Sequence, residues 1–214
     1  MRIVDLTHKI KAEMPVYPGT EPPVLQQANT MEKDGFVETK LTLYSHTGTH
    51  MDAPAHMLEA GVFLEEQEAG RFVGSATVLD FTGWKSERIG LEEMAPYEEK
   101  IKKADFVILK TGWAKLWGSE AYFKGFPALS LEAARWLSGF SLKGIGVDTI
   151  SIDVMGSNTM EVHKQLLSNN INIIENLTNL DAVEQETFLF CCLPLKFQES
   201  DGAPVRAVAI EDRS

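Results

Sequence analysis

Cysteine is scarce in this chain of 214 residues: it has two, the neighbours Cys191 and Cys192. Two adjacent cysteines do not make the disulfide framework of a small secreted protein, so we expect a reducing compartment and predict a cytoplasmic protein. Both lie in an apolar run and are predicted to be small buried residues on a strand. Residues 1–5 reach an acidic side chain before an apolar segment begins, which predicts that there is no signal peptide.

Long apolar runs and basic charge are also lacking. The longest apolar run, residues 188–195, is much shorter than the roughly 20 residues of a membrane-spanning helix. Lysine and arginine number 20 against 31 acidic residues, for a formal net charge of -11. Because phosphate backbones attract basic surfaces, this balance argues against nucleic acid as a partner. We therefore expect neither a membrane nor a nucleic-acid partner, and a small molecule as the substrate.

The chain has no internal repeat, low-complexity tract or Gly/Ser-rich linker, which predicts one domain over residues 1–214. Short apolar runs alternate with helical patterns, so we predict an α/β fold with a mixed central sheet. The predicted strands are residues 1–10, 37–45, 75–81, 106–111, 144–152, 171–177, 188–197 and 204–210, and the predicted helices are 90–103, 130–138 and 160–168.

Three local features refine this outline. Residues 37–45 alternate apolar and polar side chains, which predicts a half-buried strand. Ser130 is a good N-cap for the helix that follows it. Asp201-Gly202 is typical of a hairpin turn and is predicted to join the last two strands.

Potential ligands or acid–base groups are concentrated in residues 45–57, which read S-H-T-G-T-H-M-D-A-P-A-H-M. The ionisable side chains in this segment are His46, His50, Asp52 and His56. One histidine alone is usually structural. Four ionisable groups interleaved with glycine, threonine and proline are hard to explain as core or as solvated surface.

The backbone conformation decides whether these groups can meet. In a straight strand, His46 and Asp52 would lie roughly 20 Å apart, too far to share one cation. In a helix, Asp52 would point away from the histidines. The segment must therefore bend, and Gly48 and Pro54 stand where such bends are needed.

Two imidazoles and one carboxylate are a familiar ligand set for zinc, manganese or ferrous iron. We expect a divalent metal, with zinc first and manganese as the alternative. Because Asp52 could bridge two cations, a site with one ion and a site with two both remain open.

Residues 46–56 resemble the H-x-G-T-H-x-D-x-P-x-H signature of the cyclase-like metal-dependent hydrolases, a family that includes bacterial kynurenine formamidases and isatin hydrolases. The resemblance extends over nearly the whole chain. Its further blocks are residues 5–8, 14–19, 125–127, 163–175, 193–195 and 202–207.

The resemblance implies a swivelling β/β/α domain with a barrel-like mixed sheet, in a homodimer or larger homo-oligomer. It also implies a role for His56 as the residue that transfers a proton. The metal ligands that it implies are His46, His50 and Asp52 for a first ion, and Asp52, His163 and Glu175 for a second.

Glu175 and His163 can also be judged from their surroundings in the sequence. Glu175 follows Ile173 and Ile174 in a predicted strand, and a buried carboxylate there needs a cationic partner. The alternative is a glutamate in water at the end of the sheet, with His163 on an exposed helix face. The resemblance favours the reading of both as ligands.

Tyr17 stands where bacterial kynurenine formamidases tend to have tryptophan, in a Pro-x-aromatic-Pro-Gly loop thought to cover the substrate. Its ring could stack on an aryl group and so bind substrate. The alternative is a loop residue that packs over the rim of the site.

The resemblance implies hydrolysis of a carbon–nitrogen bond other than a peptide bond. The leading hypothesis is an arylformamidase of tryptophan degradation, which converts N-formyl-L-kynurenine to kynurenine and formate. A metal lowers the pKa of a bound water to near ~7, and the resulting hydroxide would attack the carbonyl while His56 supplies a proton to the amine. The alternatives are hydrolysis of isatin or another cyclic amide, a metal-dependent cyclase or dehydratase, and a metal-binding module without catalysis.

Other residues are given plainer roles. Asp148 and Asp153 flank a predicted strand end and could support the site, although capping or turn bonds are the preferred reading. His8 is predicted to be structural. Trp113 and Trp117, four residues apart, are predicted to share a packing face.

Overall fold

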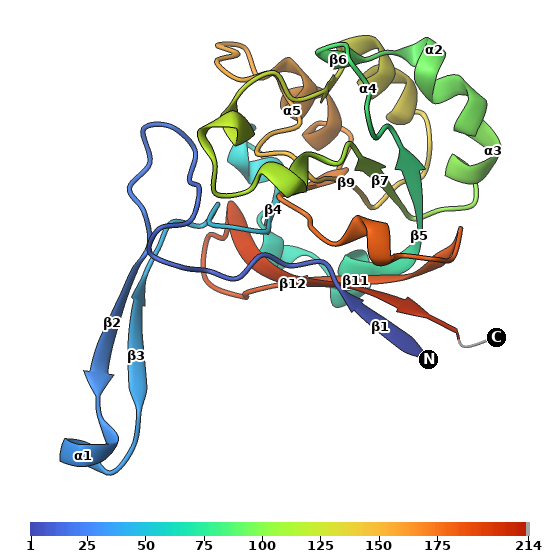
Figure 1. Ribbon diagram of the computed structural model, residues 1–214. Helices are drawn as coiled ribbons and strands as arrows, with labels where there is room; N and C mark the ends of the chain where they lie inside the picture. The colour runs from blue at the N-terminus through green and yellow to red at the C-terminus, as the bar shows by residue number, and fades with distance from the viewer. Residues whose placement is uncertain (213–214) are drawn as a thin grey trace.

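A mixed eight-stranded sheet forms the centre of the computed structural model, which describes residues 1–212 (Figure 1). The strand order is β1-β12-β11-β5-β7-β9-β10-β4, and β12 also pairs with β4, so that seven strands close a ring and β1 lies outside it on β12. The strands of this sheet are β1 (Arg2–Asp5), β4 (His50–Asp52), β5 (Val73–Asp80), β7 (Phe106–Lys110), β9 (Gly144–Val147), β10 (Asn172–Glu175), β11 (Phe188–Pro194) and β12 (Gly202–Glu211).

The predicted α/β class with a barrel-like mixed sheet is confirmed by this closed ring. That residues 1–214 form one domain stays a prediction, and residues 213 and 214 lie outside the described part. Among residues 1–212, no helix is both long and apolar enough to cross a membrane.

Four neighbouring strands, β5, β7, β9 and β10, run parallel and are joined by crossovers that contain the helices. Strands buried on both faces read as continuous apolar runs, as in β7 and β9. The helices lie together over one side of the sheet (Figure 1). They are α2 (Leu91–Met94), α3 (Glu98–Ile101), α4 (Leu131–Leu137) and α5 (Glu161–Leu167), beside a short parallel pair, β6 (Arg88–Ile89) and β8 (Ala128–Leu129).

The segment predicted as one helix over residues 90–103 is broken into α2, a 3₁₀ turn at Ala95–Tyr97 and α3. Pro96 lies in that turn and has no N–H for a helical hydrogen bond, which explains the break. The N-cap predicted at Ser130 is confirmed, because its side chain accepts a hydrogen bond from the N–H of Ala133 at 3.1 Å.

Several predicted strands are longer than the observed ones. β9 ends at Val147, and β10 ends at Glu175 because Asn176 adopts a left-handed conformation with φ of 59°. The last two strands form the predicted antiparallel hairpin, but the turn predicted at Asp201-Gly202 is misplaced. β11 ends at Pro194, residues 195–201 form the connection, and Gly202 is the first residue of β12. Gly202 is already paired with Asp52 of β4, so it belongs to the ladder rather than to the turn.

Two apolar cores flank the sheet. One lies between the sheet and the helices and includes Leu109, Ile145 and Leu166. The other includes Phe106, Phe190 and Cys192, of which the cysteine is fully buried. The burial predicted for Cys192 is confirmed, whereas Cys191 is only half-buried.

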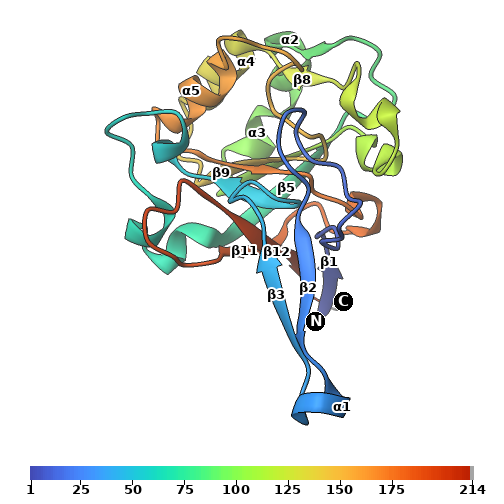
Figure 2. The ribbon, with the colours of Figure 1, turned by 90° about the vertical axis from the view of Figure 1, so that its left-hand side faces the viewer.

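An antiparallel arm projects from the body of the molecule (Figures 1 and 2). It consists of β2 (Val24–Asn29) and β3 (Glu38–Thr42), with α1 (Met31–Asp34) at its tip. Every residue of β3 is exposed, so the half-buried strand predicted over residues 37–45 is wrong about burial. Alternation indicates that one face is more apolar than the other, but no other element within residues 1–212 covers either face.

Candidate metal centre

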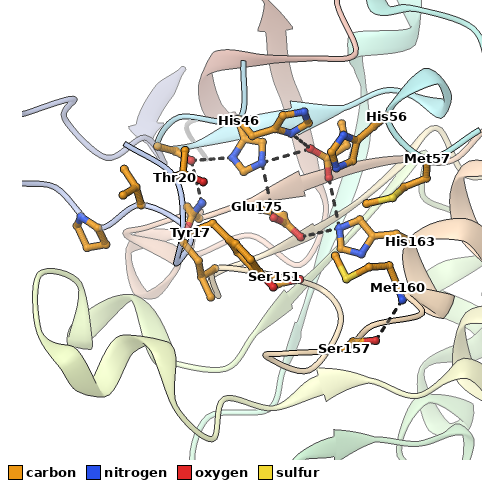
Figure 3. Close-up of a pocket in the computed structure, with 17 residues that line it drawn as sticks. Tyr17, Thr20, His46, His56, Met57, Ser151, Ser157, Met160, His163 and Glu175 are labelled. Atoms are coloured by element: carbon orange, nitrogen blue, oxygen red, sulfur yellow. Dashed lines mark hydrogen bonds and ion pairs between the residues drawn. The ribbon is translucent and has the colours of Figure 1, made fainter. Parts of the chain in front are cut away.

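The ligand candidates converge from separate elements on one pocket (Figure 3). His50 and Asp52 are two residues apart on β4 and therefore point to the same face. Glu175 of β10 is the antiparallel partner of His50 and joins them on that face. His163 reaches the same place from α5. His46 comes from the loop before β4.

The bend predicted at Gly48 is present and is fixed by hydrogen bonds. Gly48 has φ of 70°, a left-handed conformation that favours glycine. The side-chain amide of Asn176 donates to the carbonyl of Gly48 at 2.8 Å, and Thr49 Oγ1 donates to the carbonyl of Asn176 at 2.6 Å. Tyr122 holds the amide in turn by donating to Asn176 Oδ1 at 2.7 Å. After β4, Pro54 begins a 3₁₀ turn that carries His56 back toward the cluster.

Two carboxylates lie between two imidazoles at the centre. His50 Nε2 is 3.2 Å from Asp52 Oδ1 and 3.6 Å from Glu175 Oε2. His163 Nε2 is 3.2 Å from Glu175 Oε1 and 3.6 Å from Asp52 Oδ2. All four residues are at most 4% exposed, which excludes the alternative of a solvated Glu175 and an exposed His163.

Each of the three candidate histidine ligands has one ring nitrogen tied to a partner outside the centre. His50 Nδ1 is 2.8 Å from the carbonyl of Gly48, and His163 Nδ1 is 2.7 Å from Asp153 Oδ2. His46 Nε2 is 2.9 Å from Asp201 Oδ2, while its Nδ1 is 2.7 Å from Asp52 Oδ1. This is the arrangement in which metal-binding histidines are usually held, with the outer N–H donating and the inner nitrogen directed at the ion.

The pKa values indicate that the carboxylates of the cluster stabilise positive charge on the neighbouring histidines. Burial lowers the pKa of His46, but hydrogen bonds with Asp201 and Asp52 raise it to about 10. Burial likewise lowers the pKa of His163, which its bonds to Asp153 and Glu175 raise to about 10. Burial raises the pKa of Asp52, but the nearby His50 and His46 hold it well below its usual value. A divalent cation would supply the same positive charge and would displace these protons.

Asp52 provides a direct test of whether a metal fits. Its Oδ2 atom is buried and has no hydrogen-bond partner among residues 1–212. A buried carboxylate oxygen without a partner is costly, and a cation would remove the cost. Asp52 also belongs to both groups of potential ligand atoms that lie within 4.8 Å of one another, one with His50 and Glu175 and one with His46 and His56. The donors are the nitrogen and oxygen atoms that zinc and manganese bind, so the residues fit a divalent cation.

The centre forms the floor of a cavity of about 400 Å³. Tyr17, predicted to contact substrate, is 37% exposed and lines the cavity (Figure 3). Apolar residues supply much of the remaining wall, namely Pro15, Val16, Met57, Ile150 and Met160. The cavity therefore combines a charged floor with walls suited to a flat apolar group.

The structure brings together all six predicted residues of the centre and places Tyr17 at the same cavity. The residues concerned are His46, His50, Asp52, His56, His163 and Glu175. Their roles as ligands and as the proton-transferring residue remain predictions, because geometry alone does not test them.

The plainer predictions have mixed outcomes. Asp153 caps α5 by accepting hydrogen bonds from the N–H groups of Val162 and His163, as the preferred reading predicts. Its carboxylate also orients the His163 ring and so supports the site as well. Asp148 accepts bonds from the turn at Thr111 and Gly112, as the preferred reading predicts.

The structural role predicted for His8 agrees with its environment. Its ring is stacked on Trp117 with 3.9 Å between ring centroids. Trp113 and Trp117 both pack against the small cluster that contains Tyr122 and Phe126, so the packing face predicted for them is confirmed.

Asp201 and Asn176 were not identified as site residues from the sequence. Asn176 had a local signal, because it follows the candidate ligand Glu175 directly. Asp201 had none, because it lies far along the chain from both His46 and His56 and meets them only through the pairing of β12 with β4.

This chain is similar to known proteins in both sequence and fold. The family profile described as "Putative cyclase" matches residues 4–154. A kynurenine formamidase from Bacillus cytotoxicus is 31% identical over 206 residues, which cover 96% of this chain and 95% of that protein. A solved structure described as a potential metal-dependent hydrolase with cyclase activity is 30% identical with a TM-score of 0.82, covering 97% of this chain and 96% of that one. An isatin hydrolase bound to the product analogue thioisatinate shares the fold with a TM-score of 0.90 at 21% identity, over 99% of this chain and 92% of that chain.

Proposed function

The chain belongs to the putative cyclase family, and on this premise we propose that it is a metal-dependent amide hydrolase that releases formate and kynurenine from N-formyl-L-kynurenine. The observation that carries the proposal is the buried cluster around Asp52, whose Oδ2 atom has no hydrogen-bond partner among residues 1–212, at the floor of a cavity with apolar walls. Near full-length similarity to kynurenine formamidases at 31% identity supports the choice of an aryl formamide as substrate.

The proposed ligands of a divalent ion are the two central carboxylates and the three histidines around them. They are His46, His50, Asp52, His163 and Glu175. When bound, the ion supplies an activated water at neutral pH and polarises the substrate carbonyl. We take zinc as the resident ion and manganese as the alternative, because imidazole and carboxylate donors suit both. One carboxylate oxygen of Asp52 faces His46 and His50 and the other faces His163, which supports a site for two ions.

His56 is proposed to move the proton that the leaving amine requires. It lines the cavity and is half-buried, and burial lowers its pKa. The ring is therefore neutral near pH 7 and can accept a proton, after which it can donate the proton to the amine nitrogen. Its ring centroid is 3.9 Å from that of His46, so it stands directly beside the proposed ligands.

Tyr17 and the apolar wall are proposed to hold the aryl ring of the substrate. The ring of Tyr17 lies at the cavity with Met160 and Ile150 among the other lining residues, which offers both stacking and sulfur–aromatic contacts. Tyr17 also brings a hydroxyl group that a tryptophan lacks, so it can form a hydrogen bond to a substituent of the substrate.

We further propose that the protein is a cytoplasmic homo-oligomer, at least a dimer, held in part by the β2–β3 arm. An isolated two-stranded hairpin is only marginally stable in water. This arm also exposes apolar side chains, so both features favour contact with another chain. Leu25, Met31, Phe36, Val37 and Leu41 are each at least 42% exposed. A second copy of the chain would cover them, and sedimentation of a variant with residues 24–42 replaced by a short turn should show dissociation to monomers.

The substrate proposal is tested by a comparison of two amides. Zinc-loaded protein is assayed for kynurenine release from N-formyl-L-kynurenine and for ring opening of isatin. We expect a clear preference for the formamide and a loss of about 10²-fold or more in kcat for His56→Ala. Preference for isatin would replace the formamide by a cyclic amide, and full activity of His56→Ala would refute the role of that residue.

A further inference from the structure

One carboxylate outside the cluster faces two histidines with different proposed tasks. Asp201 Oδ2 is 2.9 Å from Nε2 of His46, a proposed ligand, and 3.6 Å from Nδ1 of His56, the proposed proton-transferring residue. The two imidazoles lie side by side (Figure 3), with 3.9 Å between their centroids and 37° between their planes. Among residues 1–212, the ion pairs of Asp201 are with these two histidines alone.

The turn that carries Asp201 is clamped by a second carboxylate, Glu65. Glu65 Oε2 accepts hydrogen bonds from the backbone N–H and the hydroxyl of Ser200 at 3.0 and 2.6 Å. Its Oε1 accepts from the N–H of Glu199 at 2.5 Å. Ser200 is fully buried, and its carbonyl accepts from the N–H of Leu64 at 2.9 Å. The turn is therefore held in place by three hydrogen bonds to the carboxylate of Glu65, one from the N–H of Glu65 to Ser200 Oγ and one from the N–H of Leu64.

The other side of Asp201 is tied to β4, the strand of the proposed ligands. Its carbonyl accepts a hydrogen bond from the N–H of Ala53 at 2.9 Å, and the next residue, Gly202, pairs with Asp52. Because the backbone is fixed on both sides, Asp201 is held within reach of the two imidazoles.

We propose that Asp201 is a positioning residue that sets both His46 for the metal and His56 for proton transfer, with Glu65 holding the turn in place. The bond from His46 Nε2–H to Asp201 leaves Nδ1 of that ring directed at Asp52 and the centre. The same oxygen faces Nδ1 of His56 and so leaves Nε2 as the nitrogen for exchange of a proton with substrate in the cavity that His56 lines. This inference rests on the metal site and the His56 role proposed above.

The test compares three variants of the full-length protein. Asp201→Asn preserves shape and removes the charge, and Glu65→Gln weakens the clamp without touching either histidine. Glu199→Gln is the matched control, because it removes a carboxylate from the same turn whose side chain is exposed. Zinc affinity of the metal-free proteins is measured by competition with a chromophoric chelator. kcat for N-formyl-L-kynurenine is then measured at saturating zinc.

For Asp201→Asn we expect zinc affinity to fall by roughly 10–100-fold, as is typical when a partner of a metal-binding histidine is lost. We expect kcat at saturating zinc to fall as well, and this second loss to vanish when His56 is already replaced by alanine. Glu65→Gln should change both quantities in the same direction by smaller factors, and Glu199→Gln should change neither. Glu65→Gln also keeps the proposal testable if Asp201→Asn does not fold.

Each outcome is decisive. Equal zinc affinity in Asp201→Asn and Glu199→Gln would overturn the role at His46. Weaker affinity with an unchanged kcat at saturating zinc would overturn the role at His56. Measurement of zinc affinity requires no substrate. If the zinc affinity depends on Asp201 but the wild-type protein leaves the formamide intact, the proposed substrate is refuted and the role of Asp201 at His46 is not. A wild-type protein that binds no zinc would refute both.

Discussion

Replacement of Gly202 by alanine should disable the metal centre without disturbing the fold. Gly202 lies in β12, and its φ is outside the left-handed region, so its backbone is one that alanine adopts. A Cβ atom placed there would lie less than 3 Å from three atoms of the His46 ring. Real Cβ atoms are essentially never found at such distances, so the imidazole must move.

The size of the effect follows from these distances. An ordinary contact requires about 3.4 Å, so the ring must shift by about 1 Å, which would break its 2.7 Å contact with Asp52 and its 2.9 Å contact with Asp201. Metal–nitrogen bonds are only about 2.0–2.1 Å long, so a shift of this size removes His46 from the ligand set. We expect zinc affinity to fall by at least roughly 10–100-fold, and kcat by about 10²-fold for a misplacement of ~1 Å.

The assay is zinc competition with a chelator, together with thermal unfolding of the metal-free protein. Gly70→Ala is the matched control, because a Cβ atom at Gly70 meets nothing within 4 Å. Because the His46–Asp52 contact is lost while Asp52 stays buried, the metal-free Gly202→Ala protein should keep the fold but unfold below the wild-type temperature. Wild-type zinc affinity in Gly202→Ala would show that His46 is not a ligand and would refute the reasoning.

Three further predictions concern the metal, the substrate wall and pH. Zinc at about 100 times its dissociation constant should raise the free energy of unfolding by about 2.7 kcal/mol in urea titrations. Asp52→Asn should abolish this increase, and equal urea midpoints with and without zinc in the wild type would contradict the prediction. Tyr17→Ala should raise KM for N-formyl-L-kynurenine by roughly 2–10-fold, the value of an aromatic contact. Tyr17→Phe keeps the ring and loses only the hydroxyl, so it should raise KM by a smaller factor, and zinc affinity should be unchanged in both. Burial lowers the pKa of His8 from 6.5 to about 4, so the stability that neutral His8 contributes is complete above pH 6.5 and is lost as the pH falls toward 4. His8→Phe, which retains a ring to stack on Trp117, should therefore lose less stability than the wild type between pH 7 and pH 4.5, and parallel pH profiles would contradict the assignment.

The centre of the site could be predicted from the sequence because most of its chemistry is local. Residues 46–56 contain four of the six candidate residues of the centre and the two bend residues, Gly48 and Pro54, that bring them together. His163 and Glu175 needed the family resemblance, because their proximity to Asp52 depends on α5 and on the pairing of β10 with β4. Asp201 was beyond reach, since its approach to His46 depends on β12 crossing to β4.

The errors in the fold have the same origin. Alternation in residues 37–45 correctly indicated a strand, but burial depends on what covers the strand, and nothing in the described part of the chain covers β3. Strand ends were misplaced where a side chain takes over the hydrogen bonding, as at Asp148 after β9, or where the backbone turns left-handed, as at Asn176 after β10. Neither event changes the apolar pattern from which the strands were predicted.

The most direct test of the central claim is a zinc titration of metal-free protein in which the rate of kynurenine formation from N-formyl-L-kynurenine is followed at each addition. The account predicts that the rate is negligible without metal, rises with each equivalent of zinc and reaches a plateau at one or two ions per chain, and that Asp52→Asn shows no rise. A metal-free protein with full activity, or a rate that is indifferent to zinc and to manganese, would contradict it.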